Sequence, residues 1–174
     1  MAGERAEREA AYLRMLREHD AAIRRLSASY ERDPARRQDL LQDIWLALWQ
    51  ALPSFRGDCS ERTFVFRIAH NRGVSHVKHW RLRHAEPMEG FDPVDARAGN
   101  PERHATDRQR RERLQRAVAR LPLGLRQTTV LMLEGLSQRE IAEVLGITEN
   151  NVAVRMTRAR AALARDLATG SGPS

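Results

Sequence analysis

Apolar residues recur along this chain at intervals of three and four, and this spacing persists in both halves of the sequence. Such a period places apolar side chains on one face of an α-helix. Alternating β-branched runs and Asn-Gly turns, which indicate strands and hairpins, are missing from the sequence. We therefore predict an all-α protein.

A segment rich in proline, glycine and acidic residues divides the chain into two helical blocks. It covers residues 86–107 and holds three prolines and two glycines. A segment of this composition buries too little apolar surface to offset the entropy lost on ordering, which predicts a flexible linker. We expect one helical domain over residues 1–85, a second over residues 108–168, and a disordered tail over residues 169–174.

The positive charge is concentrated in the second block and is carried by arginine. The formal net charge is +7, and Lys78 is the only lysine. Residues 108–174 hold 12 basic and 6 acidic side chains, whereas residues 91–107 hold 2 and 4. Because arginine binds phosphates and base edges through a planar fork, this distribution indicates binding of a polyanion. A solvated basic surface without a ligand is the alternative.

Cysteine and histidine give little support for a metal site or an enzyme. Cys59 stands alone, which excludes a disulfide framework and a cysteine-based metal site. An isolated cysteine is usually packed and inert, with redox sensing as the alternative. His70, His76, His79 and His84 lie close in sequence without zinc-type spacing, so we expect them along a nucleic-acid face. No nucleophile–base motif or phosphate-binding glycine loop appears, so we expect no enzyme activity, no metal and no cofactor.

No segment indicates export or membrane insertion. Residues 1–17 alternate in charge and lack an apolar signal region. No run approaches the about 18 apolar residues of a membrane-spanning helix. We expect a cytoplasmic protein.

The first block predicts three helices. The first runs from about Tyr12 to near Asp33-Pro34, and the second, over residues 37–52, has the clearest pattern. One stripe of the second helix is apolar and faces a core: Leu41, Ile44, Trp45, Leu48 and Leu52. Another stripe combines two carboxylates, a leucine and an amide: Asp39, Asp43, Leu46 and Gln50. This second stripe suits docking to a basic partner, although on the residues alone a solvated face is the favoured interpretation.

The third helix of the first block, over residues 61–83, carries a basic face. Phe64, Val65, Ile68 and Ala69 are expected to pack inward. The opposite side gathers cations with an asparagine and an aromatic ring: Arg67, Asn71, Arg72, His76, Lys78, His79, Trp80, Arg81 and Arg83. Such a mixture suits a nucleic-acid strand, with phosphates on the cations and bases against the ring. Trp80 fits the edge of the core equally well.

The second block contains a helix-turn-helix pattern. Ser137 and Glu140 have the spacing of a capping box, with Leu136 and Ile141 at the flanking staple positions. The helix that they open stops at Gly146, as a left-handed helix end requires. Two short helices joined by such a turn are typical of DNA-binding proteins that place the second helix in the major groove.

The helix after Gly146 has two distinct faces. Thr148 caps it, and its inward side is apolar: Val152, Met156, Ala159 and Leu163. Its outward side is polar or basic: Asn150, Asn151, Val154, Thr157 and Arg158, flanked by Arg155 and Arg160. Asparagines near the start of such a helix reach base edges, and arginines further along hold phosphates. A plain helical hairpin with a solvated basic face is the alternative.

These motifs together resemble the extracytoplasmic-function sigma factors of the sigma-70 family. The stretches DLLQDIW (39–45), ALPSFRGD (51–58) and FRIAHN (66–71) resemble their domain 2. The stretches GLSQREIA (135–142) and VAVRMTRAR (152–160) resemble their domain 4. The resemblance covers about residues 10–165, including the short linker between the domains.

The resemblance implies an RNA polymerase sigma factor that directs promoter recognition and transcription initiation, for a stress or envelope regulon. It implies docking on the β′ clamp helices of core polymerase through Asp39, Gln42, Asp43 and Leu46, with the β flap as a further contact. It also implies an anti-sigma factor held between the domains. A helix-turn-helix regulator that acts without replacing the sigma subunit is the alternative function.

The resemblance also assigns two sets of DNA contacts. The minus-ten element would be bound, and one base flipped into a pocket, by Ala51, Phe55, Arg67, Asn71, Arg72, Lys78 and Arg81. The minus-thirty-five element would be read by Gln138, Arg139, Thr148, Asn150, Asn151, Val154, Arg155 and Arg158. The family usually has an aromatic residue where Gln138 stands, a basic one where Ala153 stands and serine where Val154 stands. These departures leave the minus-thirty-five sequence preference open.

Overall fold

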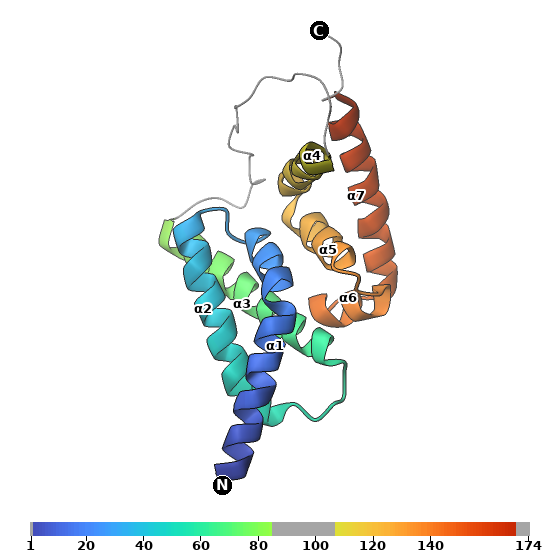
Figure 1. Cartoon of the computed structure of the whole chain (residues 1–174). Helices are drawn as coiled ribbons and strands as arrows, with labels where there is room; N and C mark the ends of the chain where they lie inside the picture. Colours follow the sequence, from blue (N-terminus) through green and yellow to red (C-terminus); the bar gives the residue numbers. More distant parts are fainter. Residues whose placement is uncertain (1, 85–106, 170–174) are drawn as a thin grey trace.

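The computed structural model describes residues 2–84 and 107–169, and no strand occurs in these ranges, which confirms the predicted all-α fold. The N-terminal domain consists of α1 (Ala2–Ala28), α2 (Pro34–Ala51), the 3-10 helix η1 (Leu52–Ser54) and α3 (Glu61–His84) (Figure 1). The C-terminal domain consists of α4 (Asp107–Arg120), α5 (Leu123–Leu133), α6 (Gln138–Leu145) and α7 (Glu149–Thr169). Residues 86–106 of the predicted linker and all but the first residue of the predicted tail lie outside the described residues, whereas Asp107 begins α4.

The boundary between α1 and α2 differs from the predicted one. Helix α1 ends at Ala28, and Asp33 begins α2 instead of ending α1. The Asp33 side chain accepts a hydrogen bond of 2.9 Å from the Arg36 amide, and Pro34 occupies the first helical turn. Aspartate at the cap followed by proline is a helix start, because proline lacks only an amide proton that would have no intrahelical partner there.

The N-terminal domain is held by apolar side chains from three long helices. They include Ile23, Leu26, Leu40, Ile44, Leu48, Val65, Phe66 and Ala69, all almost completely buried. A close approach completes this core where the Tyr30 ring lies against the backbone of Gly73. A Cβ atom at position 73 would stand 2.6 Å from the ring carbons, so only glycine fits there.

The C-terminal domain is smaller and packs its helices around α7. Its fully buried side chains include Leu131, Ile141 and Val152. Met156 and Ala159 follow Val152 on the same face of α7 and are also buried, as the sequence predicted. Because α6 has only eight residues, its position depends on this packing and on its caps.

The two domains are in contact through one continuous cluster of buried apolar side chains and through polar groups. Helix α3 packs against α6, and α1 packs against α5 (Figure 1). The Arg25 guanidinium forms two hydrogen bonds of 2.5 and 2.7 Å to the Glu134 carboxylate, whose side chain is only 9% exposed. Arg32 and Arg126, one from each domain, both donate to the carbonyl of Ala119 near the end of α4. Burial, together with the charge of Arg32, lowers the pKa of Arg126 to about 10.

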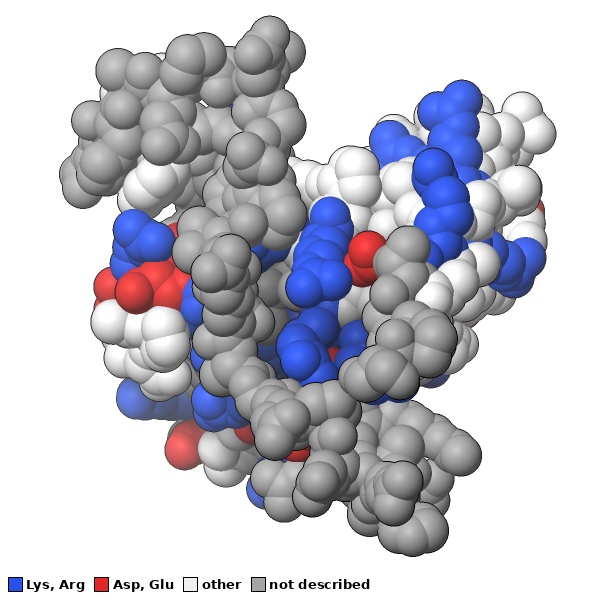
Figure 2. Space-filling view, turned by 90° about the horizontal axis from the view of Figure 1, so that it is seen from above, with Lys and Arg blue, Asp and Glu red and all other residues white. Residues whose placement is uncertain are grey.

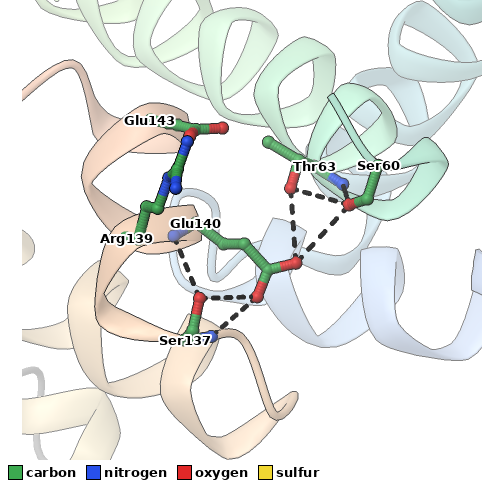
Figure 3. A network of polar contacts seen from close by, with 6 residues as sticks. All are labelled: Ser60, Thr63, Ser137, Arg139, Glu140 and Glu143. Atoms are coloured by element: carbon green, nitrogen blue, oxygen red, sulfur yellow. Dashed lines mark hydrogen bonds and ion pairs between the residues drawn. The ribbon is translucent and has the colours of Figure 1, made fainter. Parts of the chain in front are cut away.

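A second polar contact joins the start of α3 to α6 through the Glu140 carboxylate (Figure 3). Its Oε2 atom accepts hydrogen bonds of 2.8 Å from the Ser137 amide and hydroxyl, within the cap of α6. Its Oε1 atom lies 3.4 Å from the Ser60 hydroxyl and 3.5 Å from the Thr63 hydroxyl. The hydrogen bonds from Ser137 lower the pKa of Glu140. One carboxylate therefore belongs to a helix cap and to the contact between domains.

A groove of about 970 Å³ separates the ends of the domains near this interface. Its walls come from the end of α1, the start of α2, α4 and α5, and combine apolar residues with Arg24, Arg25, Arg37 and Arg126. Figure 2 looks down on this end of the molecule, and basic side chains gather in the middle of the view. Arg24 is paired with Asp20 and Arg25 with Glu134, so part of this positive charge is neutralised internally.

Candidate polymerase and promoter interfaces

Helix α2 presents the predicted docking stripe to solvent. Asp39, Gln42, Asp43 and Leu46 are all exposed, and Leu46 is 55% exposed despite being apolar. The opposite face, with Leu40 and Ile44, is buried against α1 and α3. Within the described ranges no ion pair involves either aspartate of the stripe. The stripe is thus an acidic surface around an exposed leucine, with its charges available to an external partner.

The loop after α2 is shaped by its own contacts. The 3-10 helix η1 follows α2 directly, and the Phe55 amide donates to the Leu52 carbonyl at 3.1 Å. The Phe55 ring packs on the buried Phe64 ring, with 4.6 Å between the ring centroids. Gly57 has a φ of 80°, a conformation that glycine adopts without strain. Ala51 and Phe55 are half-buried, so the loop is anchored on α3 and not free to move independently.

The outer face of α3 carries most of the predicted minus-ten residues. Arg67, Asn71, Arg72 and Lys78 are exposed, whereas the side chain of Arg81 lies outside the described residues. Arg67 also approaches Cys59, with 3.8 Å between Nη2 and Sγ. Cys59 is half-buried, and the structure shows no other group bonded to its sulfur among the residues that it describes.

Two histidines lie elsewhere than predicted. The His70 Nδ1 atom is 2.5 Å from the Tyr30 hydroxyl, and burial, together with Arg155, lowers the pKa of His70. The His76 Nε2 atom is 3.0 Å from Glu31, and both side chains are largely covered. The prediction that these two histidines lie along a nucleic-acid face is therefore wrong. The chain segment after α1 covers them. Among the α3 histidines whose side chains the structure describes, His79 alone is exposed.

Trp80 and Glu31 anchor the start of α2. Trp80 is half-buried, and the Arg36 guanidinium carbon lies 5.1 Å from the centre of its ring. Burial favours the neutral form of Glu31. Hydrogen bonds from the Asp33 amide and His76, with the charge of Arg36, outweigh burial and lower the pKa of Glu31. Trp80 thus packs at the edge of the domain, the second of its two predicted locations.

The helix-turn-helix has the predicted local structure. Ser137 and Glu140 form both hydrogen bonds of the capping box, and Gly146 has a left-handed φ of 65°. The Ile147 amide donates to the Ala142 carbonyl at 3.1 Å, which closes the end of α6. The Thr148 hydroxyl accepts a 3.2 Å hydrogen bond from the Asn151 amide and caps α7. The caps and the glycine turn fix the angle at which α7 leaves α6.

Most of the predicted minus-thirty-five residues form an exposed surface on α6 and α7. The exposed members are Gln138, Arg139, Thr148, Asn150, Asn151, Val154 and Arg158. Arg155 is half-buried, and its Nε atom donates to the Asn151 side-chain oxygen at 3.2 Å. Arg139 is paired with Glu143 at 3.3 Å. The surface offers asparagine amides and an exposed valine, flanked by arginines, which are the groups that read base edges.

Several contacts had no counterpart in the sequence analysis. They include the Arg25–Glu134 pair, the Tyr30–His70 hydrogen bond and the contact of Glu140 with Ser60. A further cluster, Glu18, His19 and Glu61, places potential metal ligands within 4.8 Å of one another. Arg14 already binds Glu61, so the cluster is an ion-pair network at the start of α3.

In the ranges that the structure describes, no helix is long and apolar enough to cross a bilayer.

Comparison with known proteins places both domains in one family. The chain matches the family models "Sigma-70 region 2" over residues 15–82 and "Sigma-70, region 4" over residues 111–163. It is 30% identical over 156 residues to the ECF RNA polymerase sigma factor SigM of Mycobacterium tuberculosis, covering 89% of this chain and 76% of that protein. It is 30% identical over 136 residues to the ECF RNA polymerase sigma-E factor of Escherichia coli, covering 72% and 70%.

Solved structures agree with these relatives. CnrH, solved in complex with the cytosolic domain of CnrY, has a TM-score of 0.66 at 26% identity and covers 94% of this chain and 91% of its own. The sigma factor RpoE of Bartonella quintana, solved with the anti-sigma factor NepR, has the same fold, with a TM-score of 0.72 at 21% identity over 90% and 96%. The two region matches and these relatives show that the chain belongs to the extracytoplasmic-function sigma factors of the sigma-70 family.

Proposed function

We propose that this sigma factor, which binds core RNA polymerase and directs promoter recognition and transcription initiation, divides these tasks among α2, α3 and α7. The observation that carries the proposal is the exposed stripe of α2. Two aspartates that form no ion pair with any described residue and a leucine that is 55% exposed lie on the side of α2 opposite its buried face. A basic partner surface with an apolar pocket complements such a stripe. Asp39, Gln42, Asp43 and Leu46 therefore dock on the β′ clamp helices.

The outer face of α3 binds the minus-ten element. Its exposed cations, Arg67, Arg72 and Lys78, follow one another along the helix and suit the backbone of a single strand. Phe55, held against Phe64, and the exposed Asn71 form the pocket for a flipped base. Anchoring Phe55 before DNA binds reduces the entropy lost on binding, which helps to offset the unstacking of the base.

The exposed surface of α7 reads the minus-thirty-five element. Asn150, Asn151 and Val154 face solvent near the start of the helix, where a recognition helix contacts base edges. Val154 is 41% exposed and suits the methyl group of thymine. Arg158, one turn further along, binds the DNA backbone and fixes the register of α7 in the groove.

Reconstituted transcription with core polymerase and promoters from the same genome tests this assignment. Asp43→Arg reverses one charge of the α2 stripe and is expected to abolish promoter-specific transcripts while circular dichroism stays unchanged. Glu9→Arg, the same charge change at an exposed position on α1, is the matched control and should retain transcription. Normal transcription by the Asp43→Arg protein would show that α2 does not form the polymerase contact.

The relatives support proposals for the partner and the regulon of this chain. CnrH and RpoE were solved with CnrY and with the anti-sigma factor NepR, which supports an anti-sigma factor as the regulator of this chain. The names of the relatives support a stress or envelope regulon. The chain acts in the cytoplasm as an initiation factor without catalytic activity of its own. Transcript profiling after overexpression identifies the regulon, and failure to change any transcript would contradict its assignment.

A further inference from the structure

The side chain of Asn151 is engaged on the exposed surface of α7. Its oxygen accepts the hydrogen bond from Arg155 Nε at 3.2 Å, one helical turn further along. Asn151 is itself exposed, so its amide nitrogen faces solvent on the surface that reads the minus-thirty-five element. The two ends of this amide are therefore not equivalent before any DNA is bound.

Arg155 is held in place from its other side. It is half-buried, in contrast to the exposed Arg158 on the same helix. Its Nη1 atom lies over Gly124 of α5, where a Cβ atom would be only 3.4 Å away. Helix α5 packs against α7, so the guanidinium is located between α5 and Asn151. A side chain fixed by packing gives a more defined orientation to its hydrogen-bond partner than a solvated one does.

The engagement of the oxygen changes which bases Asn151 recognises. An asparagine binds adenine by two hydrogen bonds, in which its oxygen accepts from N6 while its nitrogen donates to N7. Here one lone pair of the oxygen accepts from Arg155, and the nearby positive charge weakens the other as an acceptor for N6, which favours the NH₂ group as the part that addresses a base. Guanine presents two acceptors in the major groove, N7 and O6, and thymine presents one, O4. The adjacent guanidinium favours the same acceptor-rich edges.

We propose that Arg155 is a positioning residue that turns Asn151 into a hydrogen-bond donor, selective for guanine, then thymine, over adenine. The proposal rests on the reading of the minus-thirty-five element by α7. It names a base chemistry for one position of the minus-thirty-five element, whose sequence preference the family pattern leaves open.

The test is transcription by core polymerase with the full-length protein on a promoter pool randomised in the minus-thirty-five element, read by sequencing the transcripts. The position read by Asn151 is the one whose preference is lost in Asn151→Ala. There we expect the wild-type protein to favour guanine over adenine by about tenfold, within the range of one good base-edge contact. Arg155→Ala should shift this preference toward adenine, because the oxygen is released from Arg155 and regains its full strength as an acceptor. Asn151→Asp, which has acceptors only, should favour cytosine.

Arg158→Ala is the matched control, since it removes the same charge from α7 without touching Asn151. It should lower transcription from all templates and leave the preference at this position unchanged. An Arg155→Ala protein that behaves in the same way would overturn the proposal, as would a wild-type preference for adenine or an Asn151→Ala protein with unaltered preferences. Absence of promoter-specific transcription by the wild-type protein would instead contradict the proposed function.

Discussion

The two domains of this sigma factor are both helical, yet they are stabilised in different ways. Nine of the twelve largest fully buried side chains belong to the N-terminal domain, where three long helices share one core. The C-terminal domain has three of them and depends on a short α6 with a capping box and a glycine end. The N-terminal domain is thus held mainly by packing, whereas the helix-turn-helix owes more to hydrogen bonds at helix ends.

The largest effect is expected from removing the central aromatic side chain of the first core. Phe66 is completely buried, and Phe66→Ala should lower the free energy of unfolding of the N-terminal domain by about 3–5 kcal/mol. Urea unfolding followed by amide hydrogen exchange measures this change for each domain. Leu82→Ala, at a residue 84% exposed, is the control and should have little effect. Equal loss of protection in α6 and α7 would mean that the two domains are not separately stabilised.

A matched pair of cap substitutions tests directly how much each domain depends on its helix caps. Ser137→Ala and Asp33→Ala each remove a side chain that accepts from a backbone amide at a helix start, at a cost of about 1 kcal/mol. We expect Ser137→Ala to increase hydrogen exchange throughout α6, which has eight residues. Asp33→Ala should affect only the first turn of α2, because packing holds the rest. Similar exchange along both helices would contradict the distinction between the domains.

A substitution at the interface between the domains should change the free energy by less than the cap substitutions do. Arg25 is 54% exposed, and ion pairs with an exposed partner contribute about 1 kcal/mol or less. Arg25→Glu places two carboxylates together and should loosen the contact of α1 with α5, seen as a larger radius of gyration in small-angle scattering. Arg25→Glu combined with Glu134→Arg restores opposite charges and should restore the compact form. Unchanged scattering by the single variant would show that this pair does not hold the domains together.

The smallest predicted effect is a pH dependence at Glu31. Its pKa is lowered in the folded protein, so its stabilising contribution is present above the unfolded value of 4.5 and disappears as the pH falls through the lower folded value. Glu31→Gln should therefore lower the melting temperature at pH 7 and match the wild-type protein in strong acid. Glu9→Gln, at an exposed position, is the control. A difference that persists in strong acid would exclude the charge of Glu31 as its cause.

Features specified by neighbouring residues could be predicted from the sequence. The capping box at Ser137, the glycine end at Gly146 and the two faces of α2 each depend on residues within one or two helical turns. The expectation that His70 and His76 lie along a nucleic-acid face failed, because nothing local shows that Tyr30 and Glu31 cover them. The residues assigned to polymerase and promoter are mostly exposed, and their roles stay predictions.

Contacts between distant segments could not be predicted in this way. Arg25 and Glu134 are 109 positions apart, and each carries an ordinary charge for a helical surface. The contact of Glu140 with Ser60 and Thr63 could not be predicted either, because the capping box alone explains a glutamate at this position. Such pairings depend on how the two domains meet, which no helical pattern encodes.

The division of Glu140 between two sets of partners affects how quickly the protein can change shape. Movement of the domains apart breaks only the long contacts of Oε1 with Ser60 and Thr63, while Oε2 keeps the cap of α6 closed. The helix-turn-helix is then released with α6 already folded, without a renewed nucleation barrier. Domain separation is in this respect a rigid-body step, limited by the breaking of the contacts between the domains instead of by the folding of a helix.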